Sequence, residues 1–371
     1  MSLRRTSSGA TPMTQIFSSE ADVVVADPGN LAAELAAYWS GYDVEIETVG
    51  ARVTAKLGIG SGVMEPVDGA LRFRLECSEL GNLEILRSAV TETLAAFGKR
   101  EPLAIEWRGN MPTGRLFADF REVRLVSNVA IAPRIRRLVF TGDDVARFGS
   151  TADIHVRLYF PPEGLATPEW PRPGPDGRTV WPEEGRKPDV RYYTVRRFRP
   201  ETNEIEIDFV MHDDEGPGSA FASRARPGAL CGMAGPVGRV APKAGWTLLA
   251  GDETALPAIA RMLEEMPRDT QGLVFVEIDS ERDEIPLAAP PAVVVTWLRR
   301  RGAPAGATDL LLRAVETAQI PQSDDVFVWV ACEIMAAKAL RKHLRTARGL
   351  ARDRHLVVGY WEREVEEAAA A

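Results

Sequence analysis

The segment Arg191-Tyr192-Tyr193-Thr194 combines three kinds of side chain that suit a flat cofactor carrying phosphate groups. An aromatic ring can stack on a planar ring system, a guanidinium can pair with phosphate oxygens, and a hydroxyl can hydrogen-bond to a ring nitrogen. The surrounding letters, VRYYTVRRF, predict a β-strand. An isolated match of this length also fits a plain strand with one aromatic in the core and an arginine at the surface. The cofactor hypothesis therefore needs support from other segments.

A second segment with phosphate-binding chemistry follows in IDFVMHDDEGPGSAFA. A predicted strand that carries Asp208 ends at His212, and the turn Gly216-Pro217-Gly218-Ser219 opens a short helix at Ala220. The first turn of a helix presents backbone N–H groups that suit a phosphate. The alternative is that the glycines only make a turn and that Ser219 caps the helix. His212 is interpreted either as a structural histidine or as a neighbour of the cofactor.

A third candidate segment, Gly251-Asp252-Glu253-Thr254-Ala255, joins the apolar run WTLLAG to the helix-like run LPAIARML. In a parallel sheet such a loop lies at the carboxyl end of a strand and faces the ligand cleft. Its polar side chains would contact the ligand there, or would only cap the helix. The loop lacks GxGxxG, so that dinucleotide fingerprint does not identify the domain.

The composition of the whole chain limits the classes of function. At about 150 residues per domain, a chain of 371 residues predicts two or three domains. Hydrophobic residues make up 45% and charged residues 26%, which is ordinary for a globular protein. A formal charge of −8 argues against nucleic acid as the main partner. No run approaches the ~20 apolar residues of a membrane span and the start lacks a secretory signal, so we expect a cytoplasmic protein without membrane insertion.

Cysteine and histidine spacing supports neither a disulfide framework nor a metal bound by the protein. The three cysteines are far apart and form no CxxC pair, and the four histidines include no HExxH. Any iron chemistry would therefore act on a bound substrate. No side chain is identified as a catalytic acid or base.

Periodicity divides the chain into four regions. Residues 1–19 are polar without a regular period and predict a disordered tail. Residues 20–108 predict a small α+β domain of unknown role, and residues 115–243 predict an antiparallel barrel of short alternating strands. Residues 244–371 alternate near-continuous apolar strands with helices, which predicts a parallel sheet covered on both faces. The fold class is thus multidomain, with α+β and α/β parts.

Local patterns add three expectations. Asp27 precedes the helical run LAAELAAYW and can cap that helix. Tyr38 and Trp39 in this helix are predicted to lie in the core. The segment 161–188 is rich in Pro and Gly without a period, and a loop of that length inside a barrel domain suggests a lid over the barrel mouth.

Taken in order, RYYTVRRF, IDFVMHDDEGPGSAFA, GPVGR, AGDETALPAIARML, VWVACE and the terminal GYW resemble the siderophore-interacting protein family, which are FAD-binding ferric-siderophore reductases of the ferredoxin-reductase-like superfamily. The resemblance covers residues 115–361, and residues 20–108 resemble a small domain often found in front of such reductases. It implies a flavin-binding barrel, a nicotinamide-binding domain, and transfer of electrons from NADH or NADPH through FAD to a ferric siderophore, releasing Fe(II) for iron assimilation.

The resemblance also assigns roles. Arg191, Tyr193 and Thr194 would hold the flavin, residues 212 and 216–219 its phosphates, and residues 251–254 the cofactor cleft. The closing aromatics would lie near the flavin and the nicotinamide. The candidate cofactor-binding residues are Arg191, Tyr193, Thr194, Asp208, His212, Gly216, Gly218, Ser219, Ala220, Gly251, Asp252, Glu253, Thr254, Ala255, Glu333, Tyr360 and Trp361.

Three positions depart from the family pattern. Phe221 stands where the family often has Trp, and Cys332 replaces a small residue before Glu333, which would tighten the nicotinamide pocket. After Trp361 the family usually continues with Arg, whereas this chain has Glu362. An acidic side chain there would attract an anionic siderophore less strongly.

Substrate and electron donor remain open at the level of sequence. Arg299, Arg300 and Arg301 are candidate siderophore contacts, although a charged run also fits a solvated face. Glu277 and Asp279 would favour the ribose of NADH, whereas the arginines would accept the 2′-phosphate of NADPH. The alternatives are a ferredoxin-dependent or general flavin reductase, with ferredoxin as partner, and a non-catalytic flavin-binding or interaction protein.

Overall fold

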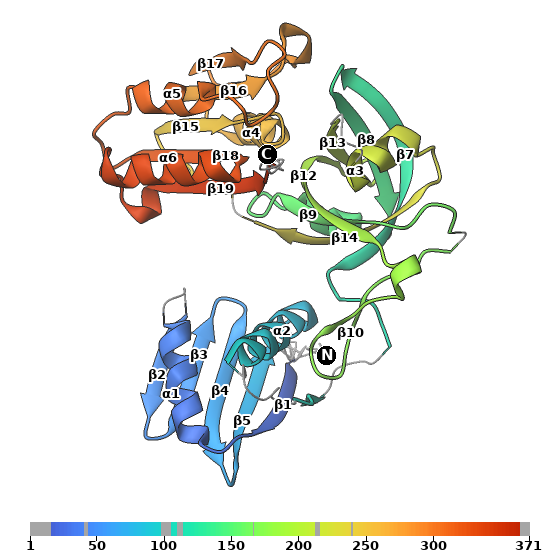
Figure 1. Cartoon of the computed structure of the whole chain (residues 1–371), viewed down its shortest axis with the longest axis vertical. Coiled ribbons are helices and arrows are strands. Elements are labelled where there is room, and N and C mark those ends of the chain that lie inside the picture. Colours follow the sequence, from blue (N-terminus) through green and yellow to red (C-terminus); the bar gives the residue numbers. More distant parts are fainter. Residues whose placement is uncertain are drawn as a thin grey trace, which may run out of the picture. The chain divides into compact units, whose positions relative to one another are not determined.

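The computed structural model describes residues 16–40, 44–97, 105–109, 114–165, 167–211, 216–238 and 240–363. The chain divides into two compact units (Figure 1). One unit comprises Met1–Asp119 with Glu169–Lys187, and the other comprises Phe120–Pro168 with Pro188–Ala371. Of the sequence motifs, residues 212–215, which include His212, and Arg239 lie outside the described residues.

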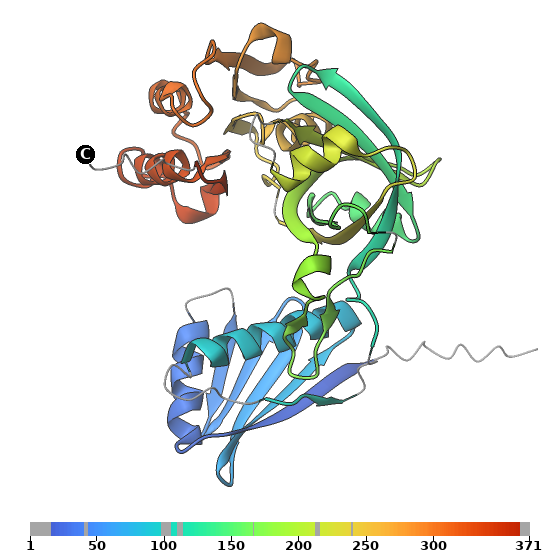
Figure 2. The same ribbon diagram turned by 45° about the vertical axis from the view of Figure 1, so that its right-hand side comes forward.

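The N-terminal unit is an antiparallel sheet with two helices on one face (Figure 2). Its elements are β1 (Phe17–Val24), α1 (Pro28–Trp39), β2 (Glu45–Val49), β3 (Arg52–Leu57), β4 (Gly60–Val67), β5 (Ala70–Cys77), α2 (Leu80–Phe97) and β6 (Arg108–Gly109). The strand order is β2-β3-β4-β5-β1-β6. Because side chains alternate along a strand, Val23 and Phe73 join the apolar core with the helices, whereas Asp22 and Arg72 form an ion pair on the other face. The predicted α+β fold is confirmed.

Three sequence expectations about this unit have different outcomes. The cap is confirmed, since Asp27 Oδ1 accepts a hydrogen bond of 2.9 Å from the Asn30 N–H. Trp39 packs against the core, but Tyr38 is 44% exposed and lies edge-on to Phe97, so the prediction of a core role for Tyr38 was wrong. Strand β1 begins at Phe17, within the segment predicted as a tail.

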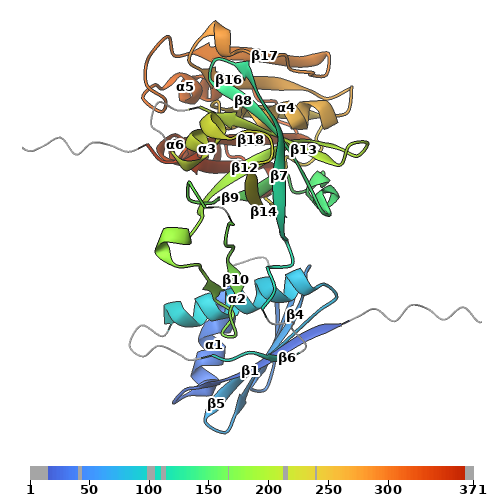
Figure 3. The same cartoon turned by 90° about the vertical axis from the view of Figure 1, so that its right-hand side faces the viewer.

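Most of the segment 161–188, predicted to be a lid over the barrel, belongs to the N-terminal unit instead. Glu169–Lys187 forms a hairpin of β10 (Arg172–Pro173) and β11 (Thr179–Val180), and Figure 3 shows β10 beside α2. Arg87 and Thr91 on α2 donate to the carbonyl oxygens of Pro175 and Asp176 at 3.0 and 2.9 Å. The prediction of a lid is therefore wrong, because polar groups on α2 bind the tip of this loop.

The fit of the hairpin is close enough to require glycine at its turn. Trp107 donates its backbone N–H to the Pro175 carbonyl at 3.1 Å and its indole N–H to Thr91 Oγ1 at 3.2 Å. Gly177 has φ +82°, and a Cβ there would lie 2.8 Å from Thr91 Oγ1. The hairpin is thus a structural part of the N-terminal unit, although the chain reaches it from the barrel.

The second unit begins with the predicted antiparallel barrel. Its strands are β7 (Phe120–Ala132), β8 (Ile135–Gly142), β9 (His155–Phe160), β12 (Asp189–Arg199), β13 (Glu204–Val210) and β14 (Leu230–Val237), and α3 (Pro217–Arg224) follows β13. They close in the order β12-β13-β8-β7-β14-β9 around an apolar core that includes Phe140, Leu158 and Ile207. Closure pairs both edges of the sheet, as expected for alternating strands with one buried face.

The C-terminal part of this unit is the predicted parallel sheet. Its elements are β15 (Trp246–Gly251), α4 (Leu256–Glu265), β16 (Gln271–Ile278), β17 (Ala292–Arg299), α5 (Leu310–Thr317), β18 (Val326–Glu333), α6 (Ile334–Thr346) and β19 (His355–Trp361), in strand order β17-β16-β15-β18-β19. One apolar core joins the sheet to α4 and another joins it to α5 and α6, so both faces are covered. Strand β18, which lies between β15 and β19, is buried at every position, and this explains its apolar run from Val326 to Cys332. None of the described helices has the length and apolarity of a membrane span.

Candidate functional site

The site begins with Tyr193, whose ring lies in the barrel beside two phenylalanines. Its ring centroid is 4.2 Å from that of Phe209 and 6.0 Å from that of Phe160. Strand β12 pairs with β9, so that Thr194 lies opposite His155. Arg191 is exposed two residues before Tyr193 and Thr194 is buried just after it. Burial raises the pKa of the Tyr193 phenol, which keeps its hydroxyl protonated as a donor.

The structure joins the first two predicted segments. Gly218, in the first turn of α3, faces the hydroxyl of Tyr193 so closely that a Cβ would lie 1.8 Å from Oη. Gly216 is the N-cap of α3, and no described side chain caps this helix. The start of α3 therefore offers the partial positive charge and the N–H groups that bind phosphate, next to an aromatic ring and near an exposed guanidinium.

Other candidates from this segment have structural contacts. Both carboxylate oxygens of Asp208 accept from Arg137 on β8, at 2.7 and 2.8 Å. Ser219 Oγ donates to the Val210 carbonyl at 3.4 Å, and the Ala220 N–H bonds to the Gly216 carbonyl. The carboxylate of Asp208 is thus bound to Arg137 on the neighbouring strand. Of the candidates in this segment, Gly216 and Gly218 best fit a phosphate-binding turn.

At the third segment, Asp252 joins the loop of residues 251–255, called the cofactor loop after its predicted role, to the end of the chain. Its Oδ1 accepts from the N–H and hydroxyl of Thr254 at 2.9 and 2.5 Å, and its Oδ2 accepts from the Trp361 indole at 2.8 Å. Burial raises the pKa of Asp252. Gly251 is needed here, since a Cβ would lie 2.5 Å from the Ala331 carbonyl oxygen and 2.3 Å from the Cβ of buried Ala255. The loop and Trp361, far apart in sequence, therefore form one surface.

The next candidates form a buried ion cluster. Arg300 Nη1 lies 2.9 Å from Glu253 Oε2 and 3.6 Å from Glu277 Oε1, and its side chain is only 2% exposed. Glu277 also accepts from the Leu311 N–H at 3.3 Å, and burial raises its pKa. Arg300 and Glu277 are thus buried and paired, Arg300 with Glu253 of the loop and with Glu277. Neither side chain is therefore available to bind a ribose or a siderophore.

The flanking arginines differ from Arg300. Arg299 donates to Glu284 at 2.9 Å, whereas Arg301 is exposed and has φ +55°. Asp279, the other candidate for ribose recognition, accepts from the Gly302 N–H at 2.9 Å. Arg301 is therefore the member of this run that is best placed to meet an anion.

The residues before α6 serve the fold. Glu333 caps α6, because its Oε2 accepts from the N–H groups of Met335 and Ala336 at 2.7 and 3.0 Å. Cys332 is 2% exposed within the apolar core under α5 and α6, and burial raises the pKa of its thiol.

Phe221 on α3 lies 5.1 Å from Phe160 between ring centroids, so it completes the aromatic cluster around Tyr193.

One residue of the site was missed by sequence reasoning. His155 Nε2 lies 2.6 Å from Tyr360 Oη, and the two rings meet edge to face. Burial, and then the charge of Arg261, lower the pKa of His155 to about 4. A histidine at the start of a strand carries no motif, so only its position opposite Thr194 identifies it. His155 thus connects the flavin strand predicted from sequence to the predicted closing aromatics.

Comparison with known proteins gives family matches to successive parts of the chain. A model described as the siderophore-interacting FAD-binding domain matches residues 124–240, and one described as siderophore-interacting protein matches residues 244–364. Residues 20–108 match a family of uncharacterized proteins conserved in bacteria.

Individual relatives agree with these matches. Ferric vibriobactin reductase ViuB of Vibrio cholerae is 35% identical over 243 residues, which are 64% of this chain and 88% of the relative. An uncharacterized protein of Mycobacterium tuberculosis is 34% identical over 252 residues, 64% of this chain and 89% of the relative. A ferric acinetobactin reductase of Acinetobacter baumannii is 29% identical over 183 residues, 48% of this chain and 63% of the relative.

Solved structures agree as well. A siderophore utilization protein from T. fusca is 40% identical with a TM-score of 0.57, covering 66% of this chain and 94% of its own. SipS from Aeromonas hydrophila is 28% identical with a TM-score of 0.57, covering 67% and 94%. A ferredoxin reductase of carbazole 1,9a-dioxygenase, 14% identical with a TM-score of 0.50 and covering 71% and 76%, shares the fold.

Proposed function

Because the chain belongs to the siderophore-interacting protein family, we propose that it is an FAD-dependent reductase that passes electrons from NADH or NADPH to the Fe(III) of a ferric siderophore. The observation that carries the proposal is the junction of His155 and Tyr360. This contact brings the strand that bears Tyr193 and Thr194 to the edge of the parallel sheet where Asp252 and the cofactor loop lie.

The residues present fit FAD. The cradle at Gly218 accepts no side chain, the start of α3 lacks a described side-chain cap, and Arg191 is exposed on β12, two residues before Tyr193. We assign the diphosphate to Gly216 and Gly218 with Arg191, and the ring system to Tyr193 and Thr194. When bound, FAD supplies the redox chemistry, accepting a hydride and giving up electrons singly to iron.

The parallel-sheet side holds the aromatic groups that would border the nicotinamide. Asp252 accepts the indole N–H of Trp361 and so fixes that ring against the cofactor loop. His155 holds the hydroxyl of Tyr360 at 2.6 Å. With its pKa lowered to about 4, His155 is neutral near pH 7 and holds Tyr360 without adding a charge. These residues position rings and exclude water, and they transfer no proton in the proposed reaction.

Iron enters the proposal as substrate. The described residues contain no cluster of three or more side chains that could hold a metal ion. Siderophores bind hard Fe(III) through oxygen atoms, so reduction to Fe(II) weakens the complex and frees the metal. Of the arginines predicted to contact the siderophore, the proposal retains Arg301, because Arg300 is buried and Arg299 is paired with Glu284.

A spectroscopic titration tests the function. The purified protein is supplied with FAD, and anaerobic NADH or NADPH is expected to bleach the flavin absorbance. A ferric catecholate or ferric hydroxamate siderophore should then restore it, with Fe(II) captured by a ferrous chelator. If only reduced ferredoxin bleaches the flavin, the nicotinamide donor is refuted. If FAD does not bind at all, the proposed enzymatic function is refuted.

A further inference from the structure

Helix α4 (Leu256–Glu265) connects the two halves of the proposed site. Its first turn follows the cofactor loop that contains Asp252, and its last turn packs against the flavin strand β12. Ten helical residues make a stiff rod about 15 Å long. The way in which the last turn is fixed to β12 therefore affects where the loop lies relative to Tyr193 and Thr194.

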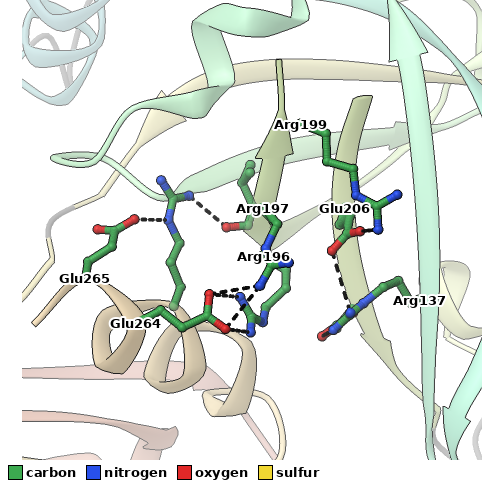
Figure 4. A network of polar contacts seen from close by, with 10 residues as sticks. Arg137, Arg196, Arg197, Arg199, Glu206, Glu264 and Glu265 are labelled. Carbon is green, nitrogen blue, oxygen red and sulfur yellow. Dashed lines mark hydrogen bonds and ion pairs between the residues drawn. The ribbon is translucent and has the colours of Figure 1, made fainter. Parts of the chain in front are cut away.

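Glu264 in this last turn binds two arginines of β12 (Figure 4). Its oxygens accept from Arg196 Nη1 at 2.9 Å and Nη2 at 2.5 Å, and from Arg197 Nη2 at 3.2 Å. Consecutive residues of a regular strand point to opposite faces, but the register of β12 with β13 shifts between Val195 and Arg197. This bulge allows both arginines to reach one carboxylate. The hydrogen bond from Arg196 is the main cause of the lowered pKa of Glu264.

Arg261, one turn earlier, binds the backbone of the barrel. Its Nη1 donates to the Val195 carbonyl at 2.7 Å, and its Nη2 donates to the Ser150 carbonyl. Nε donates to Glu265 at 3.0 Å within the same helix, and the side chain is only 6% exposed. Val195 directly follows Thr194, so this contact holds the flavin strand one residue from its predicted cofactor contact. In Figure 4, Glu264 points from this end of α4 toward Arg196 and Arg197, and Glu265 points away from them.

The strand that receives α4 is itself held by a second ionic cluster. Glu206 on β13 is fully buried, pairs with Arg199 at the end of β12, and lies 3.6 Å from Arg137 on β8. Arg137 also makes the bidentate pair with Asp208. The pair between Arg199 and Glu206 fixes β12 to β13 beyond the bulge (Figure 4). The contacts of α4 are therefore made with a part of β12 that is itself held in the barrel.

From these contacts we propose that Arg196, Arg261 and Glu264 act as positioning residues for hydride transfer. They set the distance and angle between the cofactor loop at the start of α4 and the flavin strand β12, without touching either cofactor. This inference rests on the proposed reductase function and deepens it. Charge-assisted bidentate contacts suit such a role, because they fix orientation as well as distance. A misplacement of about 1 Å at reacting centres can lower a rate about a hundredfold.

The test is the rate of flavin reduction in Glu264→Ala, measured by anaerobic stopped flow at saturating NADH and NADPH. We expect the limiting rate constant to fall about tenfold to a hundredfold. FAD affinity should stay within about twofold of wild type, since no group that holds the flavin is altered. Reoxidation by ferricyanide of flavin that dithionite has reduced should also be unchanged, because this step does not use the cofactor loop. Glu264→Gln, which keeps one acceptor oxygen, should give an intermediate rate.

A matched control is Asp309→Asn, which removes one carboxylate from an exposed ion pair with Arg313 on α5. It should reduce its flavin at the wild-type rate. An unchanged limiting rate in Glu264→Ala would overturn the inference, and so would a loss of rate that merely follows loss of FAD. If Glu264→Ala does not fold, Glu264→Gln decides by the same criteria. Wild-type flavin that neither nicotinamide reduces would instead refute the proposed function, and the positioning role with it.

Discussion

Replacing Gly218 with alanine tests the cofactor cradle most sharply. A Cβ at this position would lie 1.8 Å from Tyr193 Oη and 3.0 Å from Cζ. Favourable nonbonded contacts need about 3.5–4.0 Å, so the Tyr193 hydroxyl would have to move by about 1.5 Å or more. The backbone at Gly218 is one that alanine can adopt, because its φ is not in the left-handed region. The predicted damage is therefore steric.

The size of the effect follows from what Tyr193 would lose. Its contact with Phe209, at 4.2 Å between centroids, contributes about 0.5–1.5 kcal/mol, and an extra methyl in a packed site costs about 1–3 kcal/mol. We therefore expect the free energy of unfolding to fall by about 1–3 kcal/mol. A displaced Tyr193 should also weaken FAD binding about tenfold, which corresponds to about 1.4 kcal/mol.

Two measurements separate these effects. Quenching of FAD fluorescence on titration with apoprotein gives the Kd, and denaturant unfolding gives the stability. Gly185→Ala is the matched control, since a Cβ at Gly185 would meet nothing within 4 Å. Adding Tyr193→Phe to Gly218→Ala should recover much of the lost stability, because the clashing atom is the hydroxyl oxygen. Wild-type affinity and stability in Gly218→Ala would refute the assigned cradle.

Three further predictions concern the remaining contacts. Gly177→Ala should lower the stability of the N-terminal unit by about 1–3 kcal/mol through its positive φ and close contacts, as measured by denaturant unfolding, and an unchanged midpoint would contradict the docking of the hairpin. Trp361→Phe leaves the buried Asp252 without its indole donor, so thermal unfolding should show a loss of about 1–3 kcal/mol together with slower flavin reduction; wild-type behaviour in both would refute that contact. The pKa of His155 is lowered from 6.5 to about 4 in the folded protein, so the unfolded chain binds a proton at a higher pH than the folded chain does. The stability contributed by the neutral His155 is therefore fully present above pH 6.5 and is lost as the pH falls toward 4. Thermal unfolding against pH should therefore show a shallower acid slope in His155→Gln, and parallel slopes would contradict the assignment.

Strand and helix patterns predicted the architecture because each region has a simple period. Short alternating strands indicated the barrel, and the uniformly apolar β18 indicated a parallel sheet with both faces covered. Glycines at sites of close approach were also informative. Gly218 and Gly251 both lie where a side chain would meet another atom within 2.5 Å, and both were predicted as site residues.

Contacts between distant segments were not predictable in this way. Arg300 looks like part of an exposed basic run, yet Glu253 from the loop before α4 and Glu277 from β16 enclose it. The hairpin around Gly177 has no regular period, and its binding to α2 depends on Arg87 and Thr91 from far along the chain. Such polar pairings depend on tertiary structure, which a single sequence read locally does not contain.

The charge network at α4 was likewise invisible in the sequence. Arg196 and Arg197 come two and three residues after Thr194 and look like surface residues of a strand. A bulge in β12 brings both to Glu264, and no local pattern marks that bulge. Residues that position a site can therefore lie beside a recognised motif and still carry no signal of their own.

In the proposed reaction, electrons pass from a nicotinamide through FAD to siderophore iron. The most direct measurement is anaerobic turnover with FAD, NADH or NADPH, and a ferric siderophore, following nicotinamide absorbance and Fe(II) captured by a chelator in the same cuvette. We expect two Fe(II) for each nicotinamide oxidised, because a hydride carries two electrons and each iron accepts one. Nicotinamide oxidation without Fe(II), or no oxidation by the FAD-loaded protein, would contradict it.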